Sequence, residues 1–159
     1  MTTKTLFTTS IALFIFSAYI LATTPDANAA VSSCEITVES TDAMAFSTKN
    51  IDVSKTCKEF TINLKHVGKL SKAIMGHNLV VSKESDQKAV LEDASKAGLA
   101  SDYVKAKDGR VIAFTKIIGG GETATVKFAV NKLNAKDGYS FYCSFPGHVF
   151  NMKGTLKLV

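Results

Sequence analysis

The sequence predicts an all-β domain, a sandwich or barrel of short strands with one inserted helix. Three observations support this prediction. Apolar and polar residues alternate in several short segments after residue 30, turn-forming sequences stand between these segments, and only one stretch has helical spacing instead. The short, evenly distributed strands are typical of a single β-rich core.

The strongest strand prediction covers residues 60–65, where Phe60, Ile62 and Leu64 face one side and the intervening polar residues face the other. The same alternation returns in segments 125–130, 139–143 and 156–158. Turn sequences fall between strand candidates at Asp108-Gly109, at Gly119-Gly120-Gly121 and at Asp137-Gly138.

The inserted helix is predicted from Val90, Leu91, Ala94 and Ala97, which recur at helical spacing. Ser85 or Asp86 is the capping candidate at its start, and Gly98 is the expected stop. We expect this helix to cross one side of the sandwich.

Residues 1–29 have the pattern of a cleavable export signal. Lys4 precedes an apolar run from Leu6 to Ala22, and Ala27-Asn28-Ala29 forms a small-residue cleavage site. Thr and Ser residues interrupt the apolar run, so a membrane-spanning helix is the weaker interpretation, and no lipid-attachment sequence precedes Cys34. We therefore expect residues 30–159 to be a single exported domain, located in the periplasm, without a membrane anchor.

The formal net charge of the chain is +5. The lysines are scattered, and no run of five or six like charges occurs, so ordinary solubility is the simplest interpretation, with attraction to acidic partners as the alternative. No basic stripe interleaved with aromatic residues is present, and we expect no nucleic-acid binding.

The chain has three cysteines, at positions 34, 57 and 143. In an oxidising compartment two of them should pair, and we favour Cys34 with Cys57. Cys143 then remains as the unpaired cysteine and requires another explanation.

That explanation is offered by the run Cys143-x4-His148-x3-Met152, together with His77 upstream. One thiolate, two imidazoles and a weak axial thioether form the ligand set of a blue-copper centre. Separately, each residue has a simpler interpretation, such as a free thiol or a surface histidine. Zinc is disfavoured by the thioether, and a Cys143/His148 nucleophile pair lacks an orienting third group.

Several motifs resemble the azurins, bacterial periplasmic members of the cupredoxin family. They are Met75-Gly-His-Asn, Cys143-Ser-Phe-Pro-Gly-His148, Met152-Lys-Gly-Thr-Leu, Arg110-Val-Ile-Ala and the Cys34/Cys57 spacing. The resemblance covers essentially all of residues 30–159. It implies an eight-stranded Greek-key sandwich, a Cys34–Cys57 disulfide remote from one type 1 copper, and a distant contact from the Gly76 carbonyl. It also implies that Asn78 joins the two copper-bearing loops, and that the N–H groups of Asn78 and Phe145 bond to the Cys143 sulfur.

The resemblance further implies an apolar docking surface around an exposed His148, formed by Met44, Leu70, Met75, Phe145, Pro146, Gly147 and Phe150. Asn151 departs from the family pattern, which has an apolar residue there, and Phe150 is expected to supply the lost apolar area. His66 matches a family position that titrates without binding copper. It is a candidate pH sensor, with a structural histidine as the default.

The sequence therefore predicts a monomeric electron carrier that is not an enzyme and cycles between Cu(II) and Cu(I). The resemblance implies c-type cytochromes or a copper nitrite reductase as transient partners near His148. The alternative is a protein that binds or buffers copper without shuttling electrons.

Overall fold

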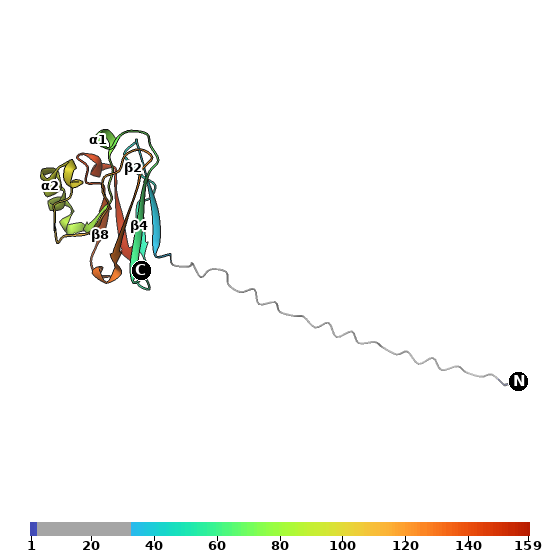
Figure 1. Cartoon of the computed structure of the whole chain (residues 1–159). Helices are drawn as coiled ribbons and strands as arrows, with labels where there is room; N and C mark the ends of the chain where they lie inside the picture. The colour runs from blue at the N-terminus through green and yellow to red at the C-terminus, as the bar shows by residue number, and fades with distance from the viewer. Residues whose placement is uncertain (3–32) are drawn as a thin grey trace. The chain divides into compact units, whose positions relative to one another are not determined.

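Two β-sheets pack face to face in the structure, a computed structural model that describes residues 1–2 and 33–159 (Figure 1). The predicted signal segment lies outside the described residues apart from its first two positions. The first sheet has the order β2-β1-β4-β7, formed by Ala45–Phe46, Glu35–Thr41, Glu59–His66 and Thr123–Ala129. The second has the order β3-β9-β8-β5-β6, formed by Asn50–Val53, Lys153–Leu158, Tyr139–Tyr142, Val80–Lys83 and Val111–Phe114.

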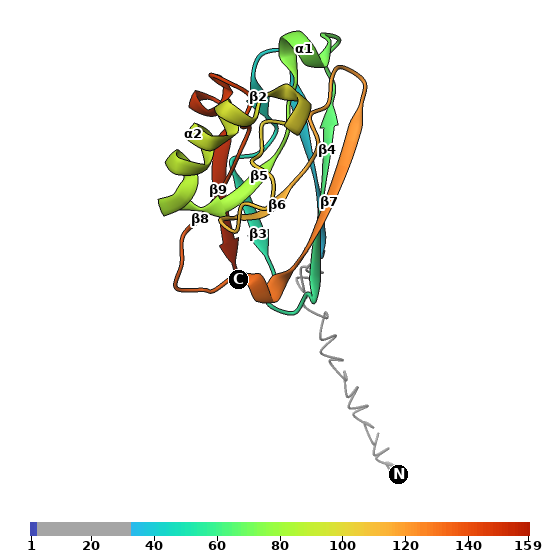
Figure 2. The same cartoon turned by 60° about the vertical axis from the view of Figure 1, so that its left-hand side comes forward.

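The strand pairing is mixed, because the chain repeatedly crosses between the sheets. β1 runs parallel to β4 and β3 runs parallel to β9, whereas the other pairs are antiparallel. The predicted sandwich is confirmed (Figure 2). The described residues hold nine strands rather than eight, and the shortest of them, β2, has two residues.

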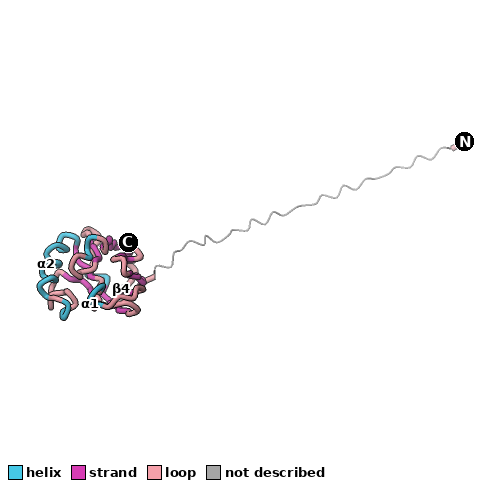
Figure 3. Tube along the Cα trace, turned by 90° about the horizontal axis from the view of Figure 1, so that it is seen from above, coloured by secondary structure: helices cyan, strands magenta, loops and turns pink. Residues whose placement is uncertain are grey.

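The apolar core lies between the sheets and follows the predicted alternation in β4, where Phe60, Ile62 and Leu64 are buried. β8 departs from it, since all four of its residues are buried. The helix α2, Gln87–Ala97, explains the difference, because Val90 from α2 packs with Tyr142 on the other face of this sheet. Figure 3 shows α2 to one side of the strands.

The predicted helix thus exists, and it ends before Gly98, which adopts a φ of 73°. Its predicted side-chain cap does not form. Asp86 occupies the N-cap position without a side-chain hydrogen bond, because a 3₁₀ turn, η1 at Glu84–Asp86, leads directly into the helix.

One turn was predicted to lie between two strands, and this placement was wrong. Asp108-Gly109 follows the 3₁₀ turn η2, Leu99–Ser101, and so it leads from a helical segment into β6 instead of joining two strands. Two further helical segments, α1 at Lys72–Met75 and η3 at Val130–Lys132, lie in loops at the ends of strands. Among the described residues, no helix is long and apolar enough to cross a membrane.

Cys34 and Cys57 form the predicted disulfide, with their Cα atoms 5.7 Å apart. It joins the start of β1 to the segment just before β4. β4 then runs eight residues to His66, a length of about 26 Å at the usual strand rise. The disulfide and His66 therefore mark opposite ends of the sandwich.

Candidate metal centre

The residues of the predicted metal site come from two loops at the His66 end. His77 lies between α1 and β5, whereas Cys143, His148 and Met152 lie between β8 and β9, with His148 starting the 3₁₀ turn η4, His148–Phe150. The second loop closes on itself: the N–H of Cys143 donates to Met152 O at 3.0 Å, and the N–H of Met152 donates to His148 O at 2.8 Å. These backbone bonds bring Cys143, His148 and Met152 close together.

Three donor atoms converge in this space. His77 Nδ1 and His148 Nδ1 are 3.2 Å apart, and Cys143 Sγ lies 4.0 Å from the former and 3.7 Å from the latter. A circle through these atoms has a radius of about 2.1 Å, close to the length of metal–nitrogen bonds in proteins. All three residues are buried, and together they form a candidate metal-binding group.

The orientation of His77 is set by the carbonyl of Thr41, which accepts a hydrogen bond from Nε2 at 2.9 Å. Nε2 therefore carries the proton, and the Nδ1 lone pair faces His148. In the metal-free protein a neutral His148 with its proton on Nδ1 donates a hydrogen bond to this lone pair, since the two nitrogens are 3.2 Å apart, and a metal ion would take the place of that proton. This arrangement fits a bound metal ion.

Burial controls the protonation of the three donors. It lowers the pKa of His77 to about 4 and also lowers the pKa of His148, so both imidazoles are neutral at pH 7. Burial raises the pKa of the Cys143 thiol to about 11, in spite of hydrogen bonds that favour the thiolate. A cation that enters at neutral pH therefore has to displace one proton, that of Cys143.

The Cys143 sulfur accepts hydrogen bonds from the backbone N–H groups of Asn78 and Phe145. Both bonds lower the pKa of the thiol because they stabilise negative charge on sulfur. The structure thus contains both hydrogen bonds that the family resemblance implied.

Asn78 also joins the two loops through its side chain. Its Oδ1 accepts the Ser144 N–H at 2.9 Å, and its Nδ2 donates to Ser144 Oγ and to Asp102 O, each at 2.8 Å. Ser144 Oγ in turn donates to Tyr103 O at 2.8 Å. The residue beside Cys143 is therefore held by a fully hydrogen-bonded buried amide.

Asp102 and Tyr103 are site-supporting residues that sequence reasoning missed. Both have left-handed backbone conformations, with φ of 55° and 50°. This conformation directs their carbonyls to Asn78 and Ser144. The sequence could not identify them, because they contribute backbone oxygens, which every residue has. The nearest signal is Asp102 itself, since Asp adopts the left-handed conformation more often than most residues.

The two remaining predicted ligands lie close by. Met152 is fully buried and is fixed through its backbone to Cys143 and His148. Gly76 precedes His77 and is also buried. A side chain at position 76 would collide with the Lys72 carbonyl and with Ile117, so only glycine allows this close approach.

His66 stacks on His77, with ring centroids 4.6 Å apart and planes at 11°. The Gly68 N–H donates to His66 Nδ1 at 3.0 Å, so Nε2 carries the proton and donates to Met75 O, also at 3.0 Å. Both nitrogens are satisfied within the protein. His66 therefore supports the His77 ring and offers no free nitrogen to a metal.

The predicted docking residues differ in exposure. Phe150, Leu70, Pro146 and Gly147 are exposed, whereas Met44, Met75 and Phe145 are half-buried. The expectation of an exposed His148 was wrong: only 5% of this residue is accessible, because the Phe145 ring stacks on its imidazole at 4.5 Å. It nevertheless retains more contact with solvent than His77, which has none.

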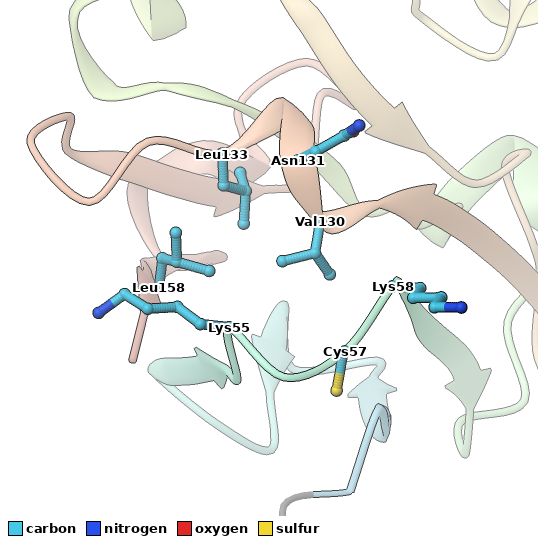
Figure 4. A pocket seen from close by; sticks show the side chains of 7 residues that line it. All are labelled: Lys55, Cys57, Lys58, Val130, Asn131, Leu133 and Leu158. Atoms are coloured by element: carbon cyan, nitrogen blue, oxygen red, sulfur yellow. The ribbon is translucent and has the colours of Figure 1, made fainter.

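A separate hollow of about 350 Å³ lies at the disulfide end (Figure 4). Val130, Leu133 and Leu158 form its apolar part. Cys57, Lys55, Lys58 and Asn131 complete its lining. This hollow shares no residue with the metal site.

Comparison with known proteins gives a consistent result. Residues 32–159 match the family model of copper binding proteins, plastocyanin/azurin family. Azurin of Alcaligenes faecalis is 62% identical over 126 residues, which is 79% of this chain and 98% of that protein. Azurin-2 of Alcaligenes xylosoxydans xylosoxydans is 60% identical over 125 residues, 79% of this chain and 97% of that protein.

A solved structure extends the similarity to the fold. The azurin Az-iso2 from the obligate methylotroph Methylomonas sp. strain J superposes with a TM-score of 0.78 at 48% identity. The match covers 80% of this chain and 98% of that one.

Proposed function

Because the chain belongs to the azurins, within the plastocyanin/azurin family of copper-binding proteins, we propose that it shuttles single electrons in the periplasm by cycling one copper between Cu(II) and Cu(I). At the coarser level, it is a copper-binding electron-transfer protein of cupredoxin fold. The finer proposal includes removal of residues 1–29 as an export signal, which leaves a monomeric domain of residues 30–159.

The observation that carries the proposal is the preformed donor triangle of His77, Cys143 and His148. We assign these three residues as the equatorial ligands, Met152 as the axial ligand and the Gly76 carbonyl as a distant fifth contact. Bound copper would supply a one-electron couple, with the soft thiolate binding both oxidation states, the imidazoles suiting Cu(II) and the weak axial thioether tuning the potential.

The role of the protein is to hold these donors still. Cys143 is buried beside Ser144, whose backbone and side chain are bonded to Asn78, and His77 is fixed by Thr41. A site that keeps its geometry in both oxidation states needs little rearrangement during electron transfer, and the transfer is correspondingly fast. A copper buffer would not need this rigidity.

We assign redox proteins as the partners, with c-type cytochromes or a copper nitrite reductase as the specific candidates. They would dock transiently near His148, which lies closer to solvent than His77. The proposal includes no substrate turnover by this chain.

Addition of Cu(II) to the purified domain tests the site directly. We expect an intense blue thiolate-to-copper absorption with one copper per chain, and Cys143→Ser should abolish it. Ser101→Cys, which places a thiol at an exposed position of η2, provides a control for nonspecific thiolate colour when combined with Cys143→Ser. A colourless wild-type product, or colour that survives Cys143→Ser, would contradict the assignment.

The self-exchange rate separates a carrier from a buffer. We expect rapid, reversible one-electron exchange between the oxidised and reduced copper-loaded chains, measured by line broadening in NMR. Stable copper binding with slow exchange would support copper buffering instead.

A further inference from the structure

A groove of about 400 Å³ lies beside the metal-binding loop, and the proposed electron-transfer role does not account for it. One wall is formed by Gln87, Lys88, Leu91 and Glu92 of α2, and the other by Val149 and Phe150 of the metal-binding loop and by Lys153 at the start of β9. We call these seven residues the α2 groove. The groove lies between α2 and the segment that connects the proposed ligands His148 and Met152.

Phe150 has no internal role that explains its position. It is 82% exposed, the highest value of any large apolar residue within residues 33–159. Its neighbour Val149 and the facing Leu91 are half-buried and pack on the cluster formed by Val80, Val90, Val104 and Tyr142. Phe150 therefore projects an apolar ring beside an apolar groove floor, as expected of a contact for another molecule.

The charge around the groove indicates which kind of molecule would bind there. Lys88 and Lys153 line the groove, and Glu92 is its one acidic residue. A third cation lies at the same loop, because Lys49 Nζ donates to Asn151 O at 2.5 Å. Three ammonium groups and one carboxylate leave an excess of positive charge around the exposed ring.

This charge distribution disfavours a second copy of the chain as the occupant. A symmetric pair that buries Phe150 of each copy in the other's groove would place Lys88 and Lys153 next to the same residues of the partner copy. Like charges across an interface are repulsive, whereas carboxylates at these positions would attract. Complementarity therefore favours an acidic partner protein.

We propose that the α2 groove is a lateral docking site for an acidic redox protein, which inserts an apolar side chain against Phe150 and pairs surface carboxylates with Lys88 and Lys153. This inference rests on the proposed electron-transfer function and specifies the partner chemistry. Phe150 lies two residues from both His148 and Met152, so a partner bound there is adjacent to the metal-binding loop. Copper held by His77, Cys143 and His148 would supply the acceptor for one electron from the ferrous haem of such a partner, which would be left as ferric haem, with no bond made or broken.

The test measures electron transfer from a reduced acidic c-type cytochrome to the copper-loaded chain by stopped flow, at several salt concentrations. We expect Lys88→Glu/Lys153→Glu to lower the second-order rate constant by about tenfold at low salt, with the difference fading as salt screens the charges. Lys55→Glu/Lys58→Glu is the matched control: it changes the net charge equally, but at the hollow of Figure 4. Its rate constant should change by less than about threefold.

The apolar contact has its own pair of variants. Phe150→Ser should lower the rate constant by about tenfold at all salt concentrations, whereas Phe114→Ser removes another exposed ring, on β6, and should leave it unchanged. A readout independent of electron transfer is NMR shift mapping of the Cu(I) chain with the cytochrome. The perturbed amides should include those of Lys88, Leu91 and Phe150.

Several results would overturn the proposal. Equal losses in the two double-lysine variants would mean that only net charge matters. Equal effects of Phe150→Ser and Phe114→Ser, or shifts confined to α1 and the Pro146 region, would place docking elsewhere. A dimer in sedimentation that Phe150→Ser dissociates would identify a second copy as the occupant.

Failure of the underlying function has a different signature. Voltammetry of the copper-loaded wild-type chain requires no partner protein. An electrochemically silent chain would contradict the proposed function itself, whereas a reversible couple with no site-specific charge effect would contradict only the α2 groove.

Discussion

His77 and His148 present facing Nδ1 atoms because neighbouring groups fix their rings. The Thr41 carbonyl accepts a hydrogen bond from His77 Nε2, and the Phe145 ring stacks on His148. The two imidazoles are therefore already positioned to bind a metal ion when none is bound. The low pKa values of both histidines are a consequence of the same burial.

The axial position gives the first residue-scale prediction. Met152→Leu should retain copper and blue colour but raise the reduction potential, because an axial electron donor stabilises the more highly charged Cu(II) more than Cu(I), and its replacement by Leu leaves a drier site. Met152 is fully buried, and the exchange nearly conserves its volume, so the fold should lose less than about 1.5 kcal/mol. Voltammetry of the copper-loaded variant provides the measurement.

Met44→Leu is the control for this exchange, since it replaces another thioether, half-buried in the loop before β2. Its potential should stay at the wild-type value. If Met152→Leu also leaves the potential unchanged, Met152 is not an axial ligand.

The sequence was informative about the side chains of the proposed site. The spacing of one loop predicts Cys143, His148 and Met152 as ligands, and a local motif predicts His77. The Thr41 carbonyl could not be predicted, because any residue supplies a backbone oxygen and the contact spans 36 positions. The burial of His148 was missed for a related reason: it depends on how Phe145 stacks, which the spacing of the loop does not determine.

At the scale of elements, the segment after α2 acts as a support for the metal-binding loop. Asp102 and Tyr103 follow η2 in left-handed conformations, and their carbonyls bond to Asn78 and Ser144. The Tyr103 ring also packs edge-on against Phe145, with centroids 5.1 Å apart. The helix insertion thus reaches the site through backbone atoms and one aromatic contact.

Asp102 provides a test of this support. Its Oδ1 accepts the N–H of the buried Ile117 at 2.8 Å, and Asp tolerates the left-handed region better than most residues. Asp102→Ala should lower the free energy of unfolding by about 2 kcal/mol, because it strands this N–H and adds backbone strain. Urea unfolding of the copper-free chain measures the loss without any contribution from metal.

Asp102→Asn is the matched variant, since it keeps an acceptor and a residue that tolerates the left-handed region. It should cost less than about 0.5 kcal/mol. Equal losses in the Ala and Asn variants would indicate that the carboxylate charge, and not its hydrogen bond, supports the segment.

Element types were more predictable than their surroundings. The strands around Phe60 and the end of α2 at Gly98 follow from periodicity and backbone preference, which are local properties. The full burial of β8 depends on α2 covering its outer face, and the context of Asp108-Gly109 depends on a 3₁₀ turn that has no periodic signal. Both differences come from tertiary packing.

At the scale of the whole molecule, the metal site places three buried titratable groups in a small sandwich, and this limits the pH range of the copper-free fold. The folded state resists protonation of His77, whose pKa falls from 6.5 to about 4. It also resists ionisation of Cys143, whose pKa rises from 9.0 to about 11. The two shifts act on opposite sides of neutrality.

The linkage fixes the direction of each effect. Below pH 6.5 the unfolded chain binds a proton at His77 that the folded chain excludes, so stability falls as pH decreases, by about 2 kcal/mol between pH 7 and 5 from this residue alone. Above pH 9 the unfolded chain releases the Cys143 proton that the folded chain keeps, so stability falls again, by about 1 kcal/mol at pH 10.

We therefore expect the copper-free domain to be most stable between about pH 6.5 and 9, measured by urea unfolding at pH 5, 7.5 and 10. Cys143→Ser should remove most of the loss at pH 10 and keep the loss at pH 5, whereas His77→Gln should do the reverse, with a remainder at pH 5 from His148, whose pKa is also lowered. The alkaline measurement stops at pH 10 because burial also raises the pKa of Tyr142, from 10.0 to about 12, which adds a second loss at higher pH. Stability that stays constant from pH 7.5 to 5 would mean that His77 accepts a proton inside the fold, and that proton would then bridge the two facing Nδ1 atoms as a hydrogen bond in the absence of copper.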